Sequence, residues 1–482
     1  MNSREIQAAT KKSVKWSLLG EIFAKIATPV STMVLARLLS PEIYGIATAV
    51  TLVITFCETI IENGFSKFLI QHDFKNKEEY DKCFSLSTYL SLFLSFIMCG
   101  LVFLFRAPLS SAVGNSGYEM VLVISCLQIP FAGINALLSA DLKRRFKFKI
   151  LFLVRIAYCI IPFAITIPLA FFGLGYWSLV IGAIALQIVQ TPLLFIISKR
   201  KLIRAFSIKG FVEITKMSFP MVLESTVIWF CTWTGMIFAA NLFDSYTVGI
   251  VKVSSSTVNS IFALFATAFT SVLFPALSRL KDDKEAYENT FYSVQGAALS
   301  IVIPLGIGVY FYSKLVTDIF LGDMWADAAF VIGIYSLTRP LMICFNNFMS
   351  EVFRSKGHFY SSILYQLGML VFDIAIKFTV GKISYEWFIW TTVLTNLFTT
   401  FLAVGILKFR YKFSIQRQIK SLLPACVCGA IMIPLILVGV NFNSGTIISF
   451  FQAIICATFY FLILSILFPK VFNNCKSFFS KR

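Results

Sequence analysis

Hydrophobic runs of about 20 residues recur along the whole chain, and they restrict its fold more than any other feature. A helix needs about 20 apolar residues to cross a bilayer, and fourteen such runs stand between short polar breaks. The predicted spans are 14–38, 43–66, 83–105, 119–140, 150–172, 174–197, 213–241, 246–278, 290–312, 328–351, 361–381, 385–407, 421–441 and 446–468. Charged residues make up 14% of the chain, against roughly 25% in soluble domains. We therefore predict an all-α polytopic membrane protein with about 14 transmembrane helices.

Basic residues are concentrated in every second gap between these runs. Of the 42 Lys and Arg residues, 32 lie in the even-numbered gaps and at the chain ends, whereas the other gaps hold Arg37, Arg106, Lys314 and Lys382. Cytoplasmic loops carry such an excess of Lys and Arg, so both termini are predicted to be cytoplasmic. This bias explains the net charge of +18 without a nucleic-acid partner. Within the spans, Arg155 and Lys216 lie near predicted cytoplasmic ends, where long side chains reach the interface.

The gaps are too short to hold a soluble catalytic domain. The longest predicted outer gaps are 106–118 and 313–327, whereas a folded domain needs about 50 residues or more. We therefore predict that the chain is not an enzyme. The two His and eleven Cys residues form no C-x-x-C pair or His-based ligand set, so we predict neither a metal site nor a cofactor.

A weak internal repeat relates two short stretches of the chain. "VLARLLSPEIYGIATAV" at 34–50 and "FAANLFDSYTVGIVKVS" at 238–254 share Ala, Leu, Gly and Ile at an offset of 204 residues. Each stretch joins two predicted spans on the outer face, and six spans separate them, so the two halves have the same orientation. We predict a six-helix lobe over 1–210, a second six-helix lobe over 211–410, and two additional transmembrane helices with a cytoplasmic tail over 411–482.

Ionisable residues lie well inside several spans. Lys25, Glu58, Glu224, Arg339 and Asp373 are the clearest cases, and each costs about 2.5–3.5 kcal/mol on the insertion scale if it faces lipid. Such groups must pair or face a hydrated cavity, and transporters hold a cavity between two repeats. Stripes of Ser and Thr on the first, second, seventh and eighth spans are compatible with this cavity, but such stripes also join helices to one another.

The acidic residues leave two interpretations open. Glu58 and Glu62 are four residues apart on one helix face, and like charges repel unless one is protonated or a cation lies near. Either Lys25 on the adjoining helix is that cation, or the pair binds a proton or sodium ion that drives transport. Asp373 and Lys377, also four apart, form an ion pair or take part in coupling. The candidates for ion coupling are Glu21, Glu58, Glu62, Glu224, Asp373 and Lys377.

Several stretches in order along the chain resemble the polysaccharide flippases. They are "ARLLSPEIYGIA" at 36–47, "NGFSKFLIQ" at 63–71, "LKRRFKFKILFLVR" at 142–155, "GLGYWSLVIG" at 173–182 and "LFPALSRLKDD" at 273–283. They are similar to the Wzx-like branch of the multidrug, oligosaccharidyl-lipid and polysaccharide exporter superfamily. The resemblance implies two pseudo-symmetric six-helix bundles plus two C-terminal helices, with alternating access of the lobes around a central polar, cationic cavity.

The resemblance also implies a substrate and a site. The substrate is a polyprenyl-diphosphate-linked oligosaccharide, moved to the outer leaflet of a bacterial cytoplasmic membrane for O-antigen, capsule or exopolysaccharide synthesis. Cationic residues in the cavity receive the diphosphate in this superfamily, and the matching positions here are Lys25, Lys252 and Arg339. Asn259 and Trp233 are candidates for contact with the sugars.

The same resemblance implies membrane lipids, a polysaccharide polymerase and a chain-length regulator as partners. Two alternatives within the superfamily stay open: a cation-coupled drug exporter and a flippase for a peptidoglycan lipid precursor. A membrane-embedded polysaccharide polymerase is disfavoured by the short outer loops.

Overall fold

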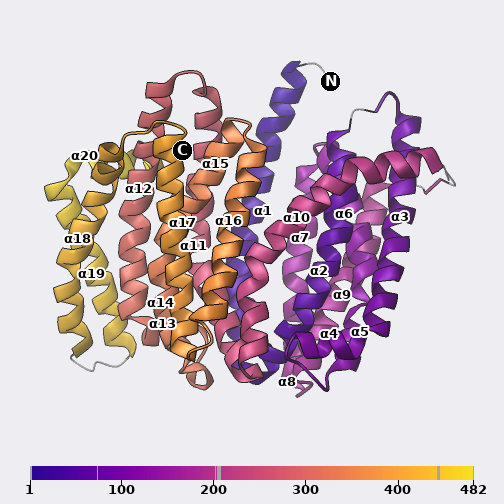
Figure 1. Cartoon of the computed structure of the whole chain (residues 1–482), viewed down its shortest axis with the longest axis horizontal. Helices are drawn as coiled ribbons and strands as arrows, with labels where there is room; N and C mark the ends of the chain where they lie inside the picture. The colour runs from indigo at the N-terminus through magenta and orange to yellow at the C-terminus, as the bar shows by residue number, and fades with distance from the viewer. Residues whose placement is uncertain (1–2, 73, 201, 204–207, 442–445, 481–482) are drawn as a thin grey trace. The chain divides into compact units, whose positions relative to one another are not determined.

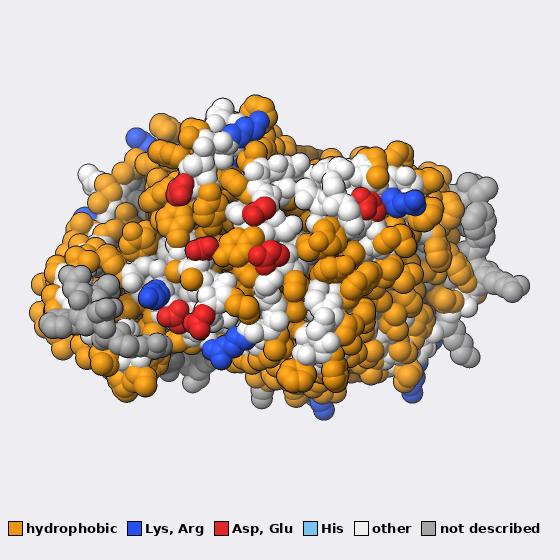
Figure 2. All heavy atoms as spheres, turned by 90° about the horizontal axis from the view of Figure 1, so that it is seen from below, with side chains coloured by type: hydrophobic (Ala, Val, Ile, Leu, Met, Phe, Trp, Pro, Cys, Tyr) orange, Lys and Arg blue, Asp and Glu red, His pale blue; other side chains and the backbone are white. Residues whose placement is uncertain are grey.

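The computed structural model describes all residues except 1–2, 73, 201, 204–207, 442–445 and 481–482, and the described residues are almost entirely helical (Figure 1). Among them, fourteen helices are long and apolar enough to cross a membrane. Each overlaps one of the predicted spans, which confirms the predicted all-α class and span count. Large hydrophobic side chains such as Phe171, Phe172, Ile196 and Phe401 are exposed, as expected where helices face lipid. Figure 2 shows how hydrophobic side chains dominate the surface.

The chain forms two compact units, Met1–Lys252 and Val253–Arg482. The helices of the first unit are α1 (Ser3–Leu38), α2 (Pro41–Gln71), α3 (Lys77–Leu104), α4 (Arg106–Ala112), α5 (Glu119–Ser125), α6 (Gln128–Arg144), α7 (Phe148–Ile161), η1 (Pro162–Thr166), α8 (Ile167–Phe171), α9 (Tyr176–Ser198) and α10 (Ile208–Leu242). Helix α11 (Ser245–Arg279) begins in the first unit and continues into the second. Helix α2 packs against α3, α6 and α10. The predicted lobes 1–210 and 211–410 and the predicted segment 411–482 stay a prediction.

The helices of the second unit are α12 (Lys284–Phe311), α13 (Ser313–Phe320), η2 (Asp323–Trp325), α14 (Ala328–Leu341), η3 (Met342–Asn347), α15 (Phe348–Ser355), α16 (Phe359–Thr379), α17 (Tyr385–Phe409), α18 (Ile415–Asn441), α19 (Thr446–Leu467) and α20 (Pro469–Ser480). Helix α12 packs against α14 and α18. A cavity of about 790 Å³ lies among α12, α13, α18, α19 and α20, and residues such as Pro304, Tyr312, Met432, Cys456 and Phe472 line it. Since its lining holds no Lys or Arg, this cavity does not suit an anionic group.

Two predicted spans are each broken by a short π-helical segment. The span predicted at 150–172 consists of α7, η1 and α8, and η1 begins at Pro162. The span predicted at 328–351 consists of α14, η3 and α15, and Pro340 lies two residues before η3. Because proline has no backbone N–H, the regular i to i−4 hydrogen bond is lost there, and a π-turn absorbs the local change in register.

The two hairpins of the internal repeat lie against each other. A Cβ atom added to Gly45 would lie 1.8 Å from the carbonyl oxygen of Ser245, and one added to Gly249 would lie 1.8 Å from the carbonyl oxygen of Pro41. Pro41 and Ser245, like Gly45 and Gly249, are 204 residues apart, so each contact is the repeat-related copy of the other. Two copies of a motif make such reciprocal contacts when a two-fold axis relates them. The glycines shared by the two stretches therefore permit close contact between the hairpins.

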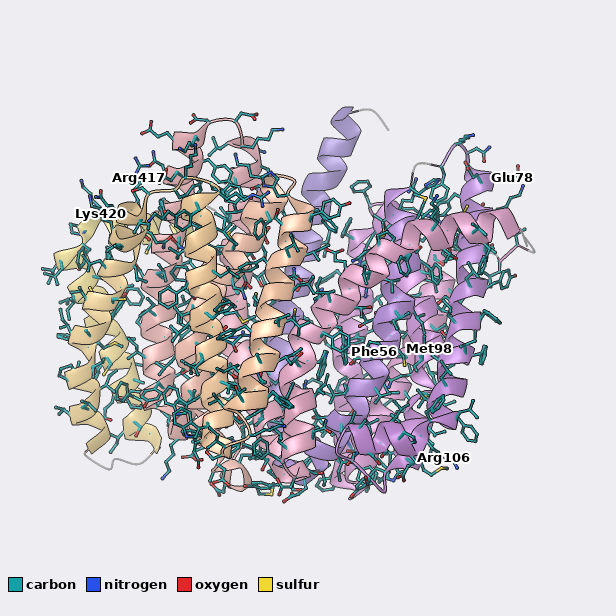
Figure 3. All side chains as sticks on the ribbon, in the orientation of Figure 1. Phe56, Glu78, Met98, Arg106, Arg417 and Lys420 are labelled. Atoms are coloured by element: carbon teal, nitrogen blue, oxygen red, sulfur yellow. The ribbon has the colours of Figure 1, made fainter. Side chains whose placement is uncertain are left out.

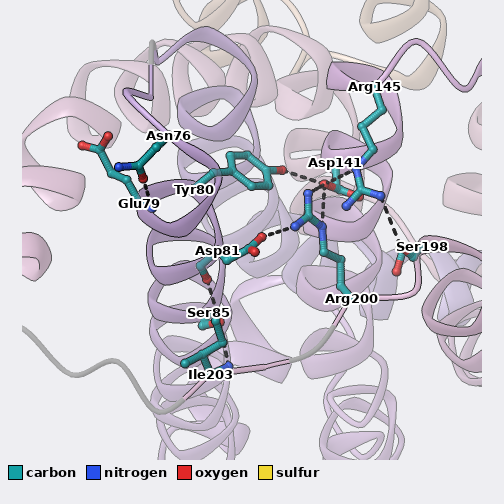
Figure 4. Close-up of polar contacts among 10 residues, drawn as sticks. All are labelled: Asn76, Glu79, Tyr80, Asp81, Ser85, Asp141, Arg145, Ser198, Arg200 and Ile203. Carbon is teal, nitrogen blue, oxygen red and sulfur yellow. Dashed lines mark hydrogen bonds and ion pairs between the residues drawn. The ribbon is translucent and has the colours of Figure 1, made fainter.

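A buried polar network joins the helix ends of the first unit on the predicted cytoplasmic side (Figure 4). The hydroxyl of Tyr80 on α3 donates to Asp141 Oδ1 on α6 at 2.8 Å, and Arg200 Nη2 donates to the same oxygen at 2.7 Å. Arg200 also pairs with Asp81. Figure 3 shows Glu78 at this end of the unit and Arg106 at the opposite end.

A related arrangement recurs at the start of α12 in the second unit. The Tyr287 hydroxyl lies 2.6 Å from Ser355 Oγ, and Arg417 Nη1 lies 3.9 Å from Glu288 Oε2. In both units a Tyr and the acidic residue after it lie near the start of a helix. An Arg that follows the sixth predicted span of the same half forms an ion pair with that acidic residue. This recurrence supports the internal repeat over a longer part of the chain than the hairpin stretches alone.

Candidate functional site

A seam between α1 and α7 in the first unit brings together charged residues from two spans. The helices are in van der Waals contact at Gly20, where a Cβ atom would lie 3.4 Å from the Phe152 ring and 3.5 Å from Arg155 Cδ. Arg155 Nη1 therefore reaches Glu21 Oε1 on α1 at 2.5 Å. Lys25 follows Glu21 by one helical turn and lies within electrostatic range of both Glu21 and Arg155. Arg155 thus forms an ion pair with another helix of the unit. Its position near the end of a predicted span had indicated a side chain that reaches the membrane interface.

The two paired side chains of the seam are only partly covered by other residues. The side chain of Arg155 is 42% exposed and that of Glu21 is 36% exposed. A fully desolvated ion pair would instead be closed off on all sides. Both side chains thus keep part of their surface outside contact with the rest of the described chain.

The acidic pair on α2 lies beside the same helix α7. Glu58 Oε1 is buried and has no hydrogen-bond partner among the described residues. Within the same part of the chain, the charged group acting on Glu58 is Glu62, and the cation acting on Glu62 is Lys143 of α6. Tyr158 of α7 lies near both carboxylates. The arrangement is a pair of half-buried carboxylates near a phenol, in which one oxygen of Glu58 is fully buried. Like charges this close favour holding a proton.

Lys252 and Trp233 lie together, as two candidates from adjoining helices. Lys252 Nζ on α11 lies 4.2 Å from the centroid of the Trp233 ring on α10. Trp233 stacks on Trp229 with the ring centroids 6.4 Å apart, and Trp229 Nε1 donates to Thr55 Oγ1 of α2 at 3.1 Å. An aromatic face holds an ammonium group with about 0.5–2 kcal/mol. The Lys252 ammonium group is therefore positioned by an aromatic face.

Glu224 has a structural partner in the first unit. Lys67 Nζ lies 3.5 Å from Glu224 Oε2 and donates to Ser225 Oγ at 3.1 Å. Lys67 was expected in a gap between spans, but helix α2 continues to Gln71, so this ion pair joins α2 to α10. This contact gives Glu224 a role in helix packing, and its role in ion coupling stays a prediction.

The candidates of the second unit are separate from one another. Arg339 lies at the end of α14 and contacts Met342 Sδ at the start of η3. Asp373 and Lys377 of α16 form an ion pair, and Thr395 Oγ1 donates to Asp373 Oδ1 at 2.9 Å. The ion-pair interpretation of Asp373 and Lys377 therefore has direct geometric support. Asn259 is exposed on α11.

The sequence interpretation gave no binding or coupling role to two residues of α7, namely Arg155 and Tyr158. A signal for them exists in the sequence, because Lys149, Phe152, Arg155 and Tyr158 follow one another at intervals of three residues. On a helix of 3.6 residues per turn each step of three falls about 60° short of a full turn, so consecutive members are neighbours but Lys149 and Tyr158 lie on opposite sides. The sequence does not show which helix packs against these residues.

Residues 34–330 match the model of a protein family described as "Polysaccharide biosynthesis protein". The chain belongs to this family. It is 21% identical over 374 residues to the succinoglycan biosynthesis transport protein ExoT of Rhizobium meliloti (strain 1021), covering 78% of this chain and 74% of that protein. It is also 21% identical over 382 residues to the lipopolysaccharide biosynthesis protein WzxC of Escherichia coli (strain K12), covering 78% of this chain and 73% of that protein.

Solved structures support the fold of this family member. The lipid II flippase MurJ in an inward closed conformation matches with a TM-score of 0.79 at 17% identity, over 95% of this chain and 99% of that one. An inward-facing multidrug resistance MATE family transporter of the MOP superfamily matches with a TM-score of 0.61 at 13% identity, over 81% of this chain and 94% of that one. These matches confirm the predicted fold class.

Together the comparisons identify a Wzx-like, multi-pass membrane transporter of polysaccharide biosynthesis. The named relatives are transport proteins and flippases, which confirms the prediction that the chain is not an enzyme.

Proposed function

We propose that this transporter moves a polyprenyl-diphosphate-linked oligosaccharide repeat unit from the cytoplasmic to the outer leaflet by alternating access. The observation that carries the proposal is the partly exposed α1–α7 seam, in which Lys25 and Arg155 lie beside Glu21 inside a spanning bundle. A lipid tail can remain in hydrocarbon, but a sugar diphosphate cannot. The protein must therefore supply a polar path with cationic groups.

The membrane potential favours the proposed direction. A diphosphate carries about two negative charges, and each charge moved across the membrane changes the free energy by about 2.3 kcal/mol per 100 mV. With an inside-negative potential, outward movement of the head group gains roughly 4–5 kcal/mol per 100 mV. The path must hold only a few cations, because tight binding would prevent release of the substrate.

The acidic pair supports a coupling role in the same unit. Glu58 Oε1 lacks a hydrogen-bond partner among the described residues, and Lys25 lies near Glu21 and Arg155. The proton-binding interpretation of Glu58 and Glu62 is therefore preferred over Lys25 as their counter-ion. The cytoplasmic location of both termini, the bacterial inner membrane and the polymerase and chain-length regulator as partners belong to the same proposal.

Deletion of the gene, with chemical analysis of the accumulated lipid, tests the proposed substrate. A polyprenyl-diphosphate-linked oligosaccharide should accumulate, and wild-type protein should clear it. Lys25→Ala should reach the membrane but fail to clear the lipid, whereas Lys382→Ala, a cation of a predicted outer gap, should behave as wild type. Accumulation of a peptidoglycan precursor instead, or a drug-sensitivity phenotype without lipid accumulation, would overturn the assignment. Complementation by Lys25→Ala would exclude Lys25 as an anion-binding residue.

A further inference from the structure

We propose that Arg155 is a further substrate-binding residue, which takes the diphosphate together with Lys25, and that Glu21 is the positioning residue that holds Arg155 until the substrate arrives. The inference rests on the proposed function, because it names the residues that receive the anionic group of that substrate. It enlarges the predicted site by a residue from a different helix, α7.

The cations of the α1–α7 seam follow one another along the helices. Lys149 Nζ of α7 lies 5.6 Å from the Trp16 ring centroid of α1, and the Trp16 and Phe152 rings are 5.2 Å apart. Arg155 and Glu21 form the next contact along the seam. Six residues separate Lys149 from Arg155, which is about 9 Å along a helix axis. The seam thus offers a cation on the predicted cytoplasmic side and two more towards its interior.

Charge distinguishes this cluster from an ordinary structural ion pair. Glu21 balances one cation, but Arg155 and Lys25 both lie near it, so the three groups carry a net positive charge. A positive charge inside a spanning bundle is costly unless an anion or water compensates it. A diphosphate with about two negative charges is attracted to the two cations of the cluster.

The chemistry of Arg155 fits a phosphate group better than a single carboxylate. A guanidinium group presents several N–H donors in a planar fork that matches phosphate oxygens. Glu21 contacts Arg155 through Oε1 and Nη1, and the Arg155 side chain is 42% exposed. The remaining donors can therefore bind an incoming anion, and Glu21 keeps the guanidinium group directed towards α1 in its absence.

Exchanging the charges of Glu21 and Arg155 distinguishes a role in substrate binding from a role in helix packing alone. If the pair is only structural, the double variant Glu21→Arg with Arg155→Glu restores the contact and restores transport. If Arg155 binds substrate, the double variant reaches the membrane at wild-type levels but does not clear the lipid-linked oligosaccharide. Restored transport in this variant would overturn the inference.

Binding of farnesyl diphosphate to the purified full-length protein in nanodiscs gives the second measurement, with farnesyl monophosphate as the matched control ligand. Arg155→Ala should weaken diphosphate binding by about tenfold or more, and Arg155→Lys should weaken it less. Glu21→Gln, which removes the positioning carboxylate but keeps the guanidinium group, should weaken it less than Arg155→Ala does. Equal losses in Arg155→Ala and Glu21→Gln would show a structural pair and overturn the inference.

Different results would contradict the proposed function and the assignment of Arg155. If deletion of the gene accumulates no lipid-linked oligosaccharide, the proposed function fails. If the lipid accumulates but Arg155→Ala binds farnesyl diphosphate as wild type does, the assignment of Arg155 alone fails.

Discussion

Asp141 shows how a single residue holds several helix ends of the first unit together. Its side chain is fully buried, and it accepts hydrogen bonds from Tyr80 at 2.8 Å and from Arg200 at 2.7 Å. Arg145, the residue directly after α6, forms an ion pair with it at 3.0 Å. Because a buried carboxylate is tolerated only when paired and hydrogen-bonded, the network depends on all of these partners.

Loss of the Asp141 charge should destabilise the protein strongly. Asp141→Asn leaves buried guanidinium groups without their main counter-ion, and breaking a buried pair from one side costs about 3–5 kcal/mol. Thermal unfolding in detergent should therefore show a clearly lower midpoint. The matched control is Glu78→Gln on α3, which removes an exposed ion pair to Lys82 and should leave the midpoint unchanged. Equal midpoints for Asp141→Asn and wild type would contradict a stabilising network.

At the scale of elements, the two repeat hairpins should respond in the same way to an added methyl group. A Cβ atom at Gly45 or Gly249 would lie 1.8 Å from a backbone oxygen of the other hairpin, so Gly45→Ala and Gly249→Ala should each force the hairpins apart. Overpacking of this kind costs about 1–3 kcal/mol. The free energies of unfolding of the two variants should fall by similar amounts, since the contacts are copies of each other.

Glycines in open surroundings supply the control for the hairpin prediction. A Cβ atom at Gly100 of α3 or Gly405 of α17 would meet nothing within 4 Å. Replacement by Ala in a helix interior should then be neutral or stabilise by up to about 1 kcal/mol. A loss of stability in these variants equal to that of Gly45→Ala would mean that the hairpin contact is not the cause.

The elements were predictable from the sequence to a greater extent than the contacts between them. Bilayer thickness sets the length of an apolar run, so each predicted span overlaps a helix. The seam was not predictable in this way: the distance of Arg155 from a span end is visible in the sequence, but its partner Glu21 is 134 residues away. Lys67 was placed in a gap because a cation ended the apolar run, yet α2 continues past it.

At the scale of the whole molecule, the proposed function leads us to infer that substrate charge and the acidic pair act in one transport cycle. Arg155 lies near Tyr158, and Tyr158 lies near Glu58 and Glu62. A diphosphate bound in the seam would add negative charge close to these carboxylates. Negative charge favours the protonated form of a neighbouring acid, so substrate binding and proton uptake should support each other.

Transport in proteoliposomes should therefore depend on two separate driving forces. With a pH gradient imposed at zero membrane potential, wild-type transport should be stimulated, and Glu58→Gln should lose this stimulation because the group that takes up the proton is gone. With a membrane potential imposed at equal pH, Glu58→Gln should still respond, because the diphosphate charges that the potential acts on remain. Glu224→Gln is the matched control: its carboxylate pairs with Lys67, so the variant should keep both responses. A Glu58→Gln protein that retains the full pH-gradient stimulation would assign proton coupling to another residue.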